Sequence, residues 1–326
     1  MILAGDIGGT KTDLALFDAG LKELARGQWL NRDYDGLDTV VRVFLEQERA
    51  EVTDACFGIA GVVEQGRVRM TNLSWVVDAG AMASVLHIPS VRLLNDLEAI
   101  AYGVAALDQT DFLVLNDGVA GATGNAAVIA AGTGLGEAGL YWDGTRHHPF
   151  ASEGGHTSFA PRNELEIELL RYLLKQFDHV SYERVVSGPG LVNIYRFLRD
   201  TGRGEEPSWL SESIAHSDPA AAISRAALER ASPLCMQAEH LFVSLYGAEA
   251  ANLALKTMAL AGVYVAGGIA RKITTKLADG TFRDAFLAKG RRRELLQRIP
   301  VRVVLNDKVA LRGAARCAVL ARAGHV

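Results

Sequence analysis

The sequence predicts an α/β protein built from two similar halves. Patterns typical of strands alternate along the chain with patterns typical of helices. One design also occurs twice, at residues 2–17 and 127–142: a hydrophobic strand, a tight glycine-rich turn and a second strand. A length of 326 residues favours two domains over one. We therefore expect two similar half-domains with a cleft between them.

Each glycine-rich turn has the features of a phosphate-binding loop. The first turn reads GGT at residues 8–10, and the second reads GTG at residues 132–134. Glycines leave backbone N–H groups uncovered, so that an anion can approach closely, and each threonine adds a hydroxyl. One such turn alone is more often a plain turn. A facing pair could grip a polyphosphate from both sides.

Helix and strand patterns continue in alternation through the first half. Residues 38–48 have apolar side chains at helical spacing, and residues 55–60 and 91–94 read as buried strands. A helical pattern then starts just after Asn95 and Asp96.

The second half contains more helix. Residues 163–177 form a clear amphipathic pattern, and residues 220–260 are rich in alanine and helical in character. Residues 201–219 are polar and contain glycine and proline, so we expect an exposed connection there. The remaining expected elements are strands at residues 262–266 and 301–305 and a closing helix at residues 309–323.

Composition excludes several classes of protein. The net charge of −4 argues against a protein that binds nucleic acid. Cys56, Cys235 and Cys317 are scattered singly, which indicates neither a zinc site nor a disulfide framework and fits the reducing cytoplasm. The longest uncharged stretch, residues 118–136, is interrupted by Gly, Asn and Thr and is a poor membrane span. The first residues lack the features of a signal peptide.

Asn95 and Asp96 stand between a hydrophobic strand and a helix. Both residue types are common helix caps, which is one interpretation. The other is a functional carboxylate at the carboxyl edge of a sheet, where α/β proteins bind ligands. Such a carboxylate could take the proton of a substrate hydroxyl that attacks a phosphate.

Three further segments suit ligand binding. Glu153 and His156 lie in a glycine-rich loop and could bind adjacent hydroxyls of a polyol; a metal is less favoured, because no third ligand lies nearby in sequence. Glu183 precedes another tight loop. Gly267 and Gly268 follow a strand and open a helix, where they could admit a nucleotide or allow close packing.

Together these motifs resemble those of bacterial ATP-dependent glucokinases, which belong to a superfamily with other sugar kinases and actin. The resemblance covers nearly the whole chain, and the motifs occur in the family's order. They are GDIGGT (5–10), TNLSW (71–75), LND (94–96), AGTGLG (131–136), GGH (154–156), FAP (159–161), ERVVSGPGL (183–191) and VAGGI (265–269).

The resemblance implies a role for each site residue. Asp96 would be the catalytic base that accepts the proton of the glucose 6-hydroxyl. The sugar would also be bound by Asn72, Asn95, Glu153, His156 and Glu183. The two phosphate loops would comprise Gly8, Gly9, Thr10 and Lys11, and Gly132, Thr133 and Gly134. The adenosine would lie beside Gly267 and Gly268, and Asp6 would help to hold Mg²⁺ through water.

The resemblance also implies the organisation and the reaction. Two ribonuclease-H-like domains of the actin-like ATPase fold would flank the cleft, the smaller comprising residues 1–107 and 307–326 and the larger residues 108–306. With ATP and Mg²⁺, a cytoplasmic homodimer would convert glucose to glucose 6-phosphate and ADP, a reaction of glycolysis. No nucleic acid or membrane would be a partner.

Some alternatives stay open. The first turn continues as TKTD at residues 10–13, where the glucokinases often have Thr-Asn-x-Arg. This version is more like the ROK family of sugar kinases and repressors, although the zinc-binding cysteine cluster of that family is absent. The substrate could be another hexose or an amino sugar, and the donor could be ADP or polyphosphate. A non-catalytic sensor or repressor is the other class, but a sensor would be expected to lack Asp96, and a repressor would need a DNA-binding extension before the first strand.

Overall fold

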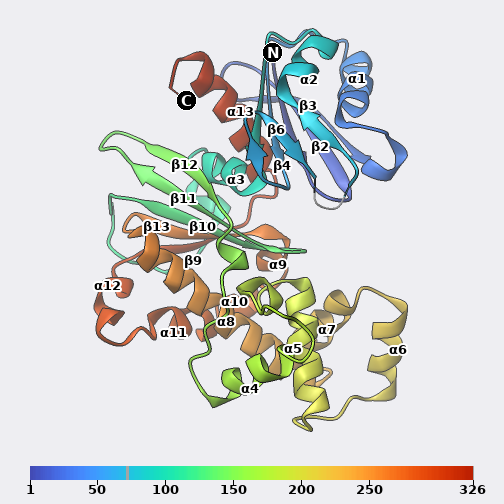
Figure 1. Cartoon of the computed structure of the whole chain (residues 1–326). Helices are drawn as coiled ribbons and strands as arrows, with labels where there is room; N and C mark the ends of the chain where they lie inside the picture. The colour runs from blue at the N-terminus through green and yellow to red at the C-terminus, as the bar shows by residue number, and fades with distance from the viewer. Residues whose placement is uncertain (71–72, 326) are drawn as a thin grey trace. The chain divides into compact units, whose positions relative to one another are not determined.

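The computed structural model describes residues 1–70 and 73–325. The chain forms two compact units (Figure 1). Unit 1 comprises Met1–Asp111, Pro149–Ala151 and Asn306–Val326, and unit 2 comprises Phe112–His148 and Ser152–Leu305. Among the predicted site residues, Asn72 lies outside the described residues.

Unit 1 is built on a five-stranded sheet with the order β3-β2-β1-β4-β8. The first two strands form an antiparallel hairpin, whereas β1, β4 and β8 run parallel, so that their carboxyl ends meet at one edge. The strands are β1 (Ile2–Ile7), β2 (Lys11–Phe17), β3 (Glu23–Leu30), β4 (Asp54–Ile59) and β8 (Ser90–Asn95). A separate small sheet consists of β5 (Val63–Glu64), β6 (Arg67–Arg69) and β7 (Val76–Asp78).

Helices cover both faces of the unit 1 sheet, because its strands carry apolar residues on both sides. On one face, Leu3 and Ile7 of β1 pack in a core with α1 (Leu37–Glu48) and α2 (Ala79–Leu86). On the other face, the core residues come from the sheet and from α3 (Asp96–Val104) and α13 (Val309–Arg322). Short 3₁₀ turns follow β3 and precede β9 at Asn31–Asp33 and Gln109–Asp111.

The two helices on the second face approach each other unusually closely at two glycines. A Cβ atom on Gly313 of α13 would lie 1.7 Å from the Ala99 carbonyl oxygen of α3. A Cβ atom on Gly103 of α3 would lie 2.0 Å from the Val309 carbonyl oxygen. No other residue type fits without moving a backbone, so α13 fixes the position of the helix that begins at Asp96.

Unit 2 repeats the strand arrangement of unit 1 in a six-stranded sheet with the order β12-β11-β10-β13-β14-β9. The hairpin β10–β11 is antiparallel, and β13 and β14 continue parallel to β10, as β4 and β8 continue from β1. The prediction of two similar α/β halves is therefore confirmed. The strands are β9 (Phe112–Asn116), β10 (Ala126–Ala131), β11 (Leu135–Trp142), β12 (His147–Ser152), β13 (Gly262–Ala266) and β14 (Val301–Val304).

Helices form most of the rest of unit 2, and α8 (Pro233–Thr257) is central to its core, packed against α5, α7 and α11. The 3₁₀ turns are η3 (Gly154–His156), η4 (Tyr182–Arg184) and η5 (Gly290–Arg292). The other helices are α4 (Glu164–Leu173), α5 (Gly188–Asp200), α6 (Ser208–His216), α7 (Pro219–Leu228), α9 (Gly267–Lys272), α10 (Thr274–Leu277), α11 (Thr281–Leu287) and α12 (Arg293–Gln297).

Two sequence predictions in unit 2 were wrong in part. The expected exposed connection at residues 201–219 contains the helix α6, whose Leu210 is fully buried in the core and whose Ile214 packs against it. The helix predicted at residues 163–177 ends at Leu173, after which the chain continues in turns.

Candidate active site

The first glycine-rich turn joins β1 to β2 and is partly open to solvent at Gly8 and Gly9. The Gly8 N–H donates to the Lys11 carbonyl, which closes the turn at 3.0 Å. Thr10 and Lys11 are exposed, and the Lys11 ammonium donates to Gln28 on β3. The predicted loop therefore exists as a turn with accessible backbone.

Asn31 stabilises this turn through hydrogen bonds, a role that the sequence analysis did not predict. Its amide donates to the Gly8 carbonyl at 2.8 Å, and its side-chain oxygen accepts from the Thr12 hydroxyl at 2.8 Å. Its backbone N–H also donates to the Thr10 carbonyl. The residue is 1% exposed, so these bonds replace water and hold the turn in one conformation.

The carboxyl edge of the unit 1 sheet brings Asp6 and Asp96 to the same face. Asp6 pairs with Gly58 across the sheet, and Ile59 pairs with Asn95. Ala4 faces the core under α3, so Asp6, two residues further on, lies on that same face. A Cβ on Gly58 would lie 2.6 Å from the Ala99 Cβ and 3.7 Å from the Asp96 Cα, so glycine at this position lets the start of α3 approach the sheet closely.

Asn95, rather than Asp96, caps the helix α3. The Asn95 side-chain oxygen accepts from the backbone N–H groups of Leu97 and Glu98, and its amide donates to the Gly61 carbonyl at 3.1 Å. Asp96 is the first helical residue and accepts from the Leu97 N–H at 3.0 Å. The interpretation of Asp96 as the helix cap is therefore wrong, because the cap position is already filled by its neighbour.

The second glycine-rich turn, in unit 2, is held from two sides. The Gly188 N–H donates to the Gly132 carbonyl at 2.8 Å, and the Leu135 N–H donates to the Glu183 carboxylate at 3.0 Å. Thr133 is exposed, and a Cβ on Gly132 would meet nothing within 4 Å. The turn thus keeps an open side next to fixed backbone.

The turn also packs against the start of α9. Gly267 has a φ of +92°, which favours glycine, and a Cβ there would lie 2.5 Å from the Ala131 carbonyl oxygen. A Cβ on Gly268 would meet nothing within 4 Å. Of the two interpretations of this pair, close packing applies to Gly267, and open access applies to Gly268.

A pocket of about 830 Å³ opens beside this turn. The glycines Gly132 and Gly268 and the side chain of Thr133 line one side. Helices α5, α7, α8 and α9 supply the rest of the wall, which includes apolar residues such as Leu191 and Phe242. Gly132 and Thr133 of the predicted second phosphate loop and Gly268 of the predicted adenosine residues therefore border one pocket, whereas Gly134 and Gly267 do not line it.

Three of the predicted sugar ligands lie on neighbouring segments of unit 2. The Glu153 carboxylate and the His156 imidazole, about 60% exposed, are 3.8 Å apart at η3. The Tyr182 N–H donates to the Thr157 carbonyl, which ties η4, and with it Glu183, to the same segment. Glu153, His156 and Glu183 can thus present polar atoms together.

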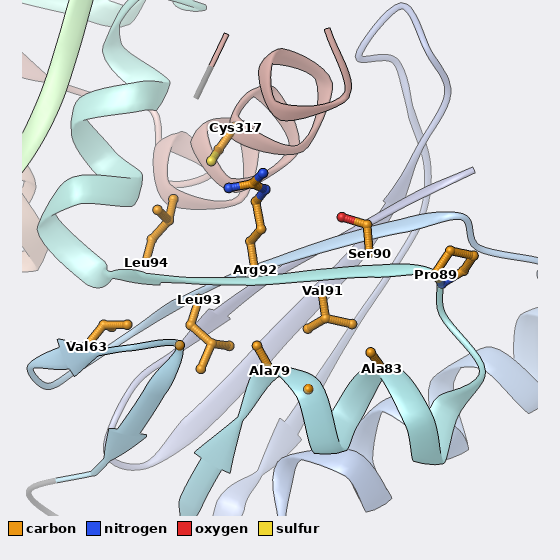
Figure 2. Close-up of a pocket in the computed structure, with 12 residues that line it drawn as sticks. Val63, Ala79, Ala83, Pro89, Ser90, Val91, Arg92, Leu93, Leu94 and Cys317 are labelled. Atoms are coloured by element: carbon orange, nitrogen blue, oxygen red, sulfur yellow. The ribbon is translucent and has the colours of Figure 1, made fainter. Parts of the chain in front are cut away.

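A second pocket, of about 520 Å³, surrounds the edge strand β8 (Figure 2). The Arg92 side chain extends toward Cys317 of α13, while Val91 and Leu93 point to the opposite side of the strand (Figure 2). No predicted site residue that the structure describes lines this pocket. It lies outside the candidate active site.

The chain was then compared with known proteins. The model of the family described as Glucokinase matches residues 3–321. A glucokinase from a Nostoc species is 42% identical over 337 residues, which is 98% of each chain. A crystal structure of glucokinase from an Antarctic psychrotroph matches with a TM-score of 0.84 at 31% identity, covering 97% of this chain and 98% of that one.

One more distant structure carries ligands. It is a ROK family glucokinase from Streptomyces griseus in complex with glucose and AMPPNP, with a TM-score of 0.66 at 21% identity, covering 97% of this chain and 98% of that one. These neighbours share the actin-like ATPase fold, so the fold class is that of the sugar kinases. The chain belongs to the glucokinase family. The prediction of a hexose kinase is confirmed.

No described helix is long and apolar enough to span a bilayer. Within residues 1–70 and 73–325, no three His, Cys, Asp or Glu side chains gather in a way that could hold a metal ion without help from a ligand.

Proposed function

We propose that this chain transfers the γ-phosphoryl group of ATP to the 6-hydroxyl of glucose, giving glucose 6-phosphate and ADP. The hydrogen bond between Glu183 and Leu135 carries the proposal, because it joins a predicted sugar ligand to the second glycine-rich turn. That turn also lines the 830 Å³ pocket. A sugar ligand, a phosphate turn and a pocket of nucleoside size therefore adjoin within one unit.

The pocket favours ATP over polyphosphate as the donor. Its wall contains apolar side chains from helices, which suit a nucleoside and have no role for a chain of phosphates. The glucokinase from Streptomyces griseus, which shares the fold, was crystallised with AMPPNP, an ATP analogue. We assign Gly267 and Gly268 to the edge of the adenosine site, and Gly132, Thr133 and Gly134 to the phosphates.

The reaction needs a base and a rigid phosphate cradle. We propose Asp96 as the base, because it follows the strand end at the sheet edge while Asn95 takes over the capping of α3. Asn95, Glu153, His156 and Glu183 would bind the remaining hydroxyls of glucose, together with Asn72. Gly8, Gly9, Thr10 and Lys11 would hold phosphate oxygens through the turn that Asn31 supports. Positioning would supply most of the catalysis.

A magnesium ion fits this site as a partner of the nucleotide. Mg²⁺ commonly binds one or two carboxylates, substrate phosphates and several waters, and does not need a full set of protein ligands. Asp6 offers one carboxylate at the sheet edge near the first turn. When bound there, partly through water, the ion would neutralise the charge that develops on the phosphoryl group.

We further propose that the two units are the two domains of the actin-like fold, and that the protein acts as a cytoplasmic homodimer in glycolysis. Cys56, Cys235 and Cys317 are buried free thiols, which supports a reducing compartment. The dimer rests on the family resemblance. Light scattering of the purified protein at micromolar concentration tests it directly.

A coupled assay tests the reaction. The protein is given glucose, mannose, fructose or N-acetylglucosamine with ATP, ADP or polyphosphate, each with and without Mg²⁺. We expect the highest kcat/KM for glucose with ATP and Mg²⁺. A higher kcat/KM with another sugar would contradict glucose as the substrate. A higher kcat/KM with another donor would contradict ATP as the donor.

A further inference from the structure

Two buried carboxyl groups face each other beneath the candidate sugar site. Glu137 on β11 is 2% exposed, and Glu249 on α8 is fully buried. The two groups lie close enough for the charge of Glu249 to raise the pKa of Glu137. Among the buried side-chain atoms that the structure describes, Oε1 of each residue has no donor from another residue. One proton between the two carboxyls supplies the missing donor for both oxygens.

A lysine places positive charge beside Glu249. The Lys256 ammonium lies 3.7 Å from Glu249 Oε1, and the Asn252 amide donates to Glu249 Oε2 at 2.7 Å. Burial, followed by repulsion from Glu249, raises the pKa of Glu137 to about 8, while burial also raises the pKa of Glu249. The pair thus keeps one proton and one negative charge at neutral pH.

The other titratable groups around the pair are tyrosines and one lysine. The Tyr182 hydroxyl of η4 accepts from the Asn252 amide at 2.9 Å and lies near Glu249, and Tyr246 of α8 lies near Glu137. Lys289, on the segment after α11, donates to the Asn252 side-chain oxygen. Burial raises the pKa of both tyrosines well above their usual value, so neither changes charge near neutral pH.

The pair touches both segments that carry the proposed sugar ligands. A Cβ on Gly154, the first residue of η3, would lie 1.9 Å from Glu137 Oε2, so the backbone between Glu153 and His156 rests on this carboxyl. On the other side, Tyr182 directly precedes Glu183, and its hydroxyl accepts from the Asn252 amide, which also donates to Glu249.

We propose that Glu137 and Glu249 share one proton and act as positioning residues for glucose, holding η3 and η4 against β11. This inference rests on the proposed sugar-binding role of Glu153, His156 and Glu183. When the proton is lost, two negative charges meet in a buried space, and their repulsion displaces Gly154 and Tyr182. The protein then binds glucose less well, whereas the nucleotide pocket is lined by other residues.

The first test is the pH profile of the wild-type protein and Glu137→Gln. If only the protonated pair binds glucose well, the KM for glucose rises about tenfold between pH 7 and pH 9, because about a tenth of the pairs then keep the proton. The KM for ATP stays within about twofold. A glutamine is neutral and donates to Glu249, so Glu137→Gln keeps a flat KM for glucose up to pH 9. Glu137→Ala, which removes the support under Gly154, has a raised KM at every pH.

A wild-type KM for glucose that does not change with pH overturns the proposal. So does a rise that persists in Glu137→Gln, since another group, such as His156, then causes it. Equal KM values for Glu137→Ala and Glu137→Gln overturn the positioning role.

Thermal melting provides a readout that needs no sugar. Glu137 is protonated in the folded state and ionised in the unfolded state between pH 4.5 and about 8, so the folded state binds more protons there. The free energy of unfolding therefore falls as the pH rises through this window and is constant above it. Glu137→Gln lacks this fall, so it melts at the wild-type temperature near pH 4.5 and above it at pH 9. The same pH slope in both proteins refutes the shared proton. A wild-type protein that shows this slope but phosphorylates no glucose refutes the proposed function instead.

Discussion

The Glu183 carboxylate accepts a 3.0 Å hydrogen bond from the backbone N–H of Leu135. Leu135 directly follows the second glycine-rich turn, so this bond links a proposed sugar ligand to a proposed phosphate loop. A Cβ on Gly134 would lie only 2.5 Å from the same carboxylate oxygen. Substitutions on the two sides of this contact therefore have different and separable consequences.

Glu183→Gln should raise the KM for glucose at least about tenfold, because a neutral amide replaces a charged acceptor of sugar hydroxyls. The glutamine oxygen can still accept from the Leu135 N–H, so the turn keeps its shape and the KM for ATP changes little. Steady-state kinetics with each substrate varied in turn measures both values. An unchanged KM for glucose would rule out Glu183 as a sugar ligand.

Gly134→Val should raise both KM values, because the new side chain pushes Glu183 away while it also crowds the phosphate turn. Gly132→Ala is the matched variant in the same turn. Its methyl group meets no protein atom within 4 Å but faces the pocket, so only the KM for ATP should rise. Calorimetry of glucose with each apo protein separates the effects. Normal glucose affinity in Gly134→Val would show that the turn and Glu183 are not coupled.

Asp96→Asn should lower kcat by at least about 10²-fold, the usual contribution of a general base. Because Asn95 fills the cap position, the melting temperature should stay within about 1 °C of the wild type. Glucose should still bind in calorimetry, although less tightly, because a carboxylate is the stronger acceptor. A near-normal kcat would mean that another residue is the base.

Whereas Asp96→Asn should mainly lower kcat, Asn95→Ala, at the adjacent position, should mainly lower stability. It removes the cap of α3 and the bond to the Gly61 carbonyl, so the free energy of unfolding should fall by about 1–2 kcal/mol. The KM for glucose should also rise. Denaturation of both variants in parallel checks that the stability loss belongs to Asn95 and the loss of turnover to Asp96.

Gly103→Ala should destabilise unit 1 by at least about 2 kcal/mol, because its Cβ would lie 2.0 Å from the Val309 carbonyl and neither backbone can yield cheaply. Gly80→Ala in α2 is the control. Its nearest neighbour is the Asp78 side chain at 3.4 Å, and alanine favours the helix, so stability should rise by about 0.5 kcal/mol. The melting temperature should fall in Gly103→Ala and rise in Gly80→Ala. Shifts of the same sign in both variants would contradict the close packing of α3 and α13.

Local pattern was sufficient to predict the hairpins and most helices. The glycine-rich turns and the strands at residues 262–266 and 301–305 depend on short-range periodicity, and the structure has them within one residue at the strand ends. The position of α3 was also evident from its spacing. The sequence pattern did not decide whether Asn95 or Asp96 caps the helix, because both residue types suit a helix cap. The structure shows that Asn95 is the last residue of β8 and therefore the one at the cap position.

Contacts between residues far apart in the sequence explain the features that the sequence analysis did not predict. Asn31 supports the first turn from the position directly after β3, and nothing near it in sequence suggests a phosphate loop. Glu137 lies in a strand that otherwise reads as apolar, and its partner Glu249 comes from a distant helix. Leu210 and Ile214 of α6 pack against a core whose other residues are mostly distant in sequence. A sequence displays the residue types at these positions but not the pairing that gives them a role.

The packing of α13 on the unit 1 sheet has a consequence for biosynthesis. Unit 2 is inserted within unit 1, so a ribosome completes all of unit 2 before it makes α13. At roughly 5–20 residues per second, the face of β1 and β4 that α13 packs on lacks that helix for tens of seconds on the nascent chain. Unit 2 can fold during that interval, whereas unit 1 must wait for the last helix.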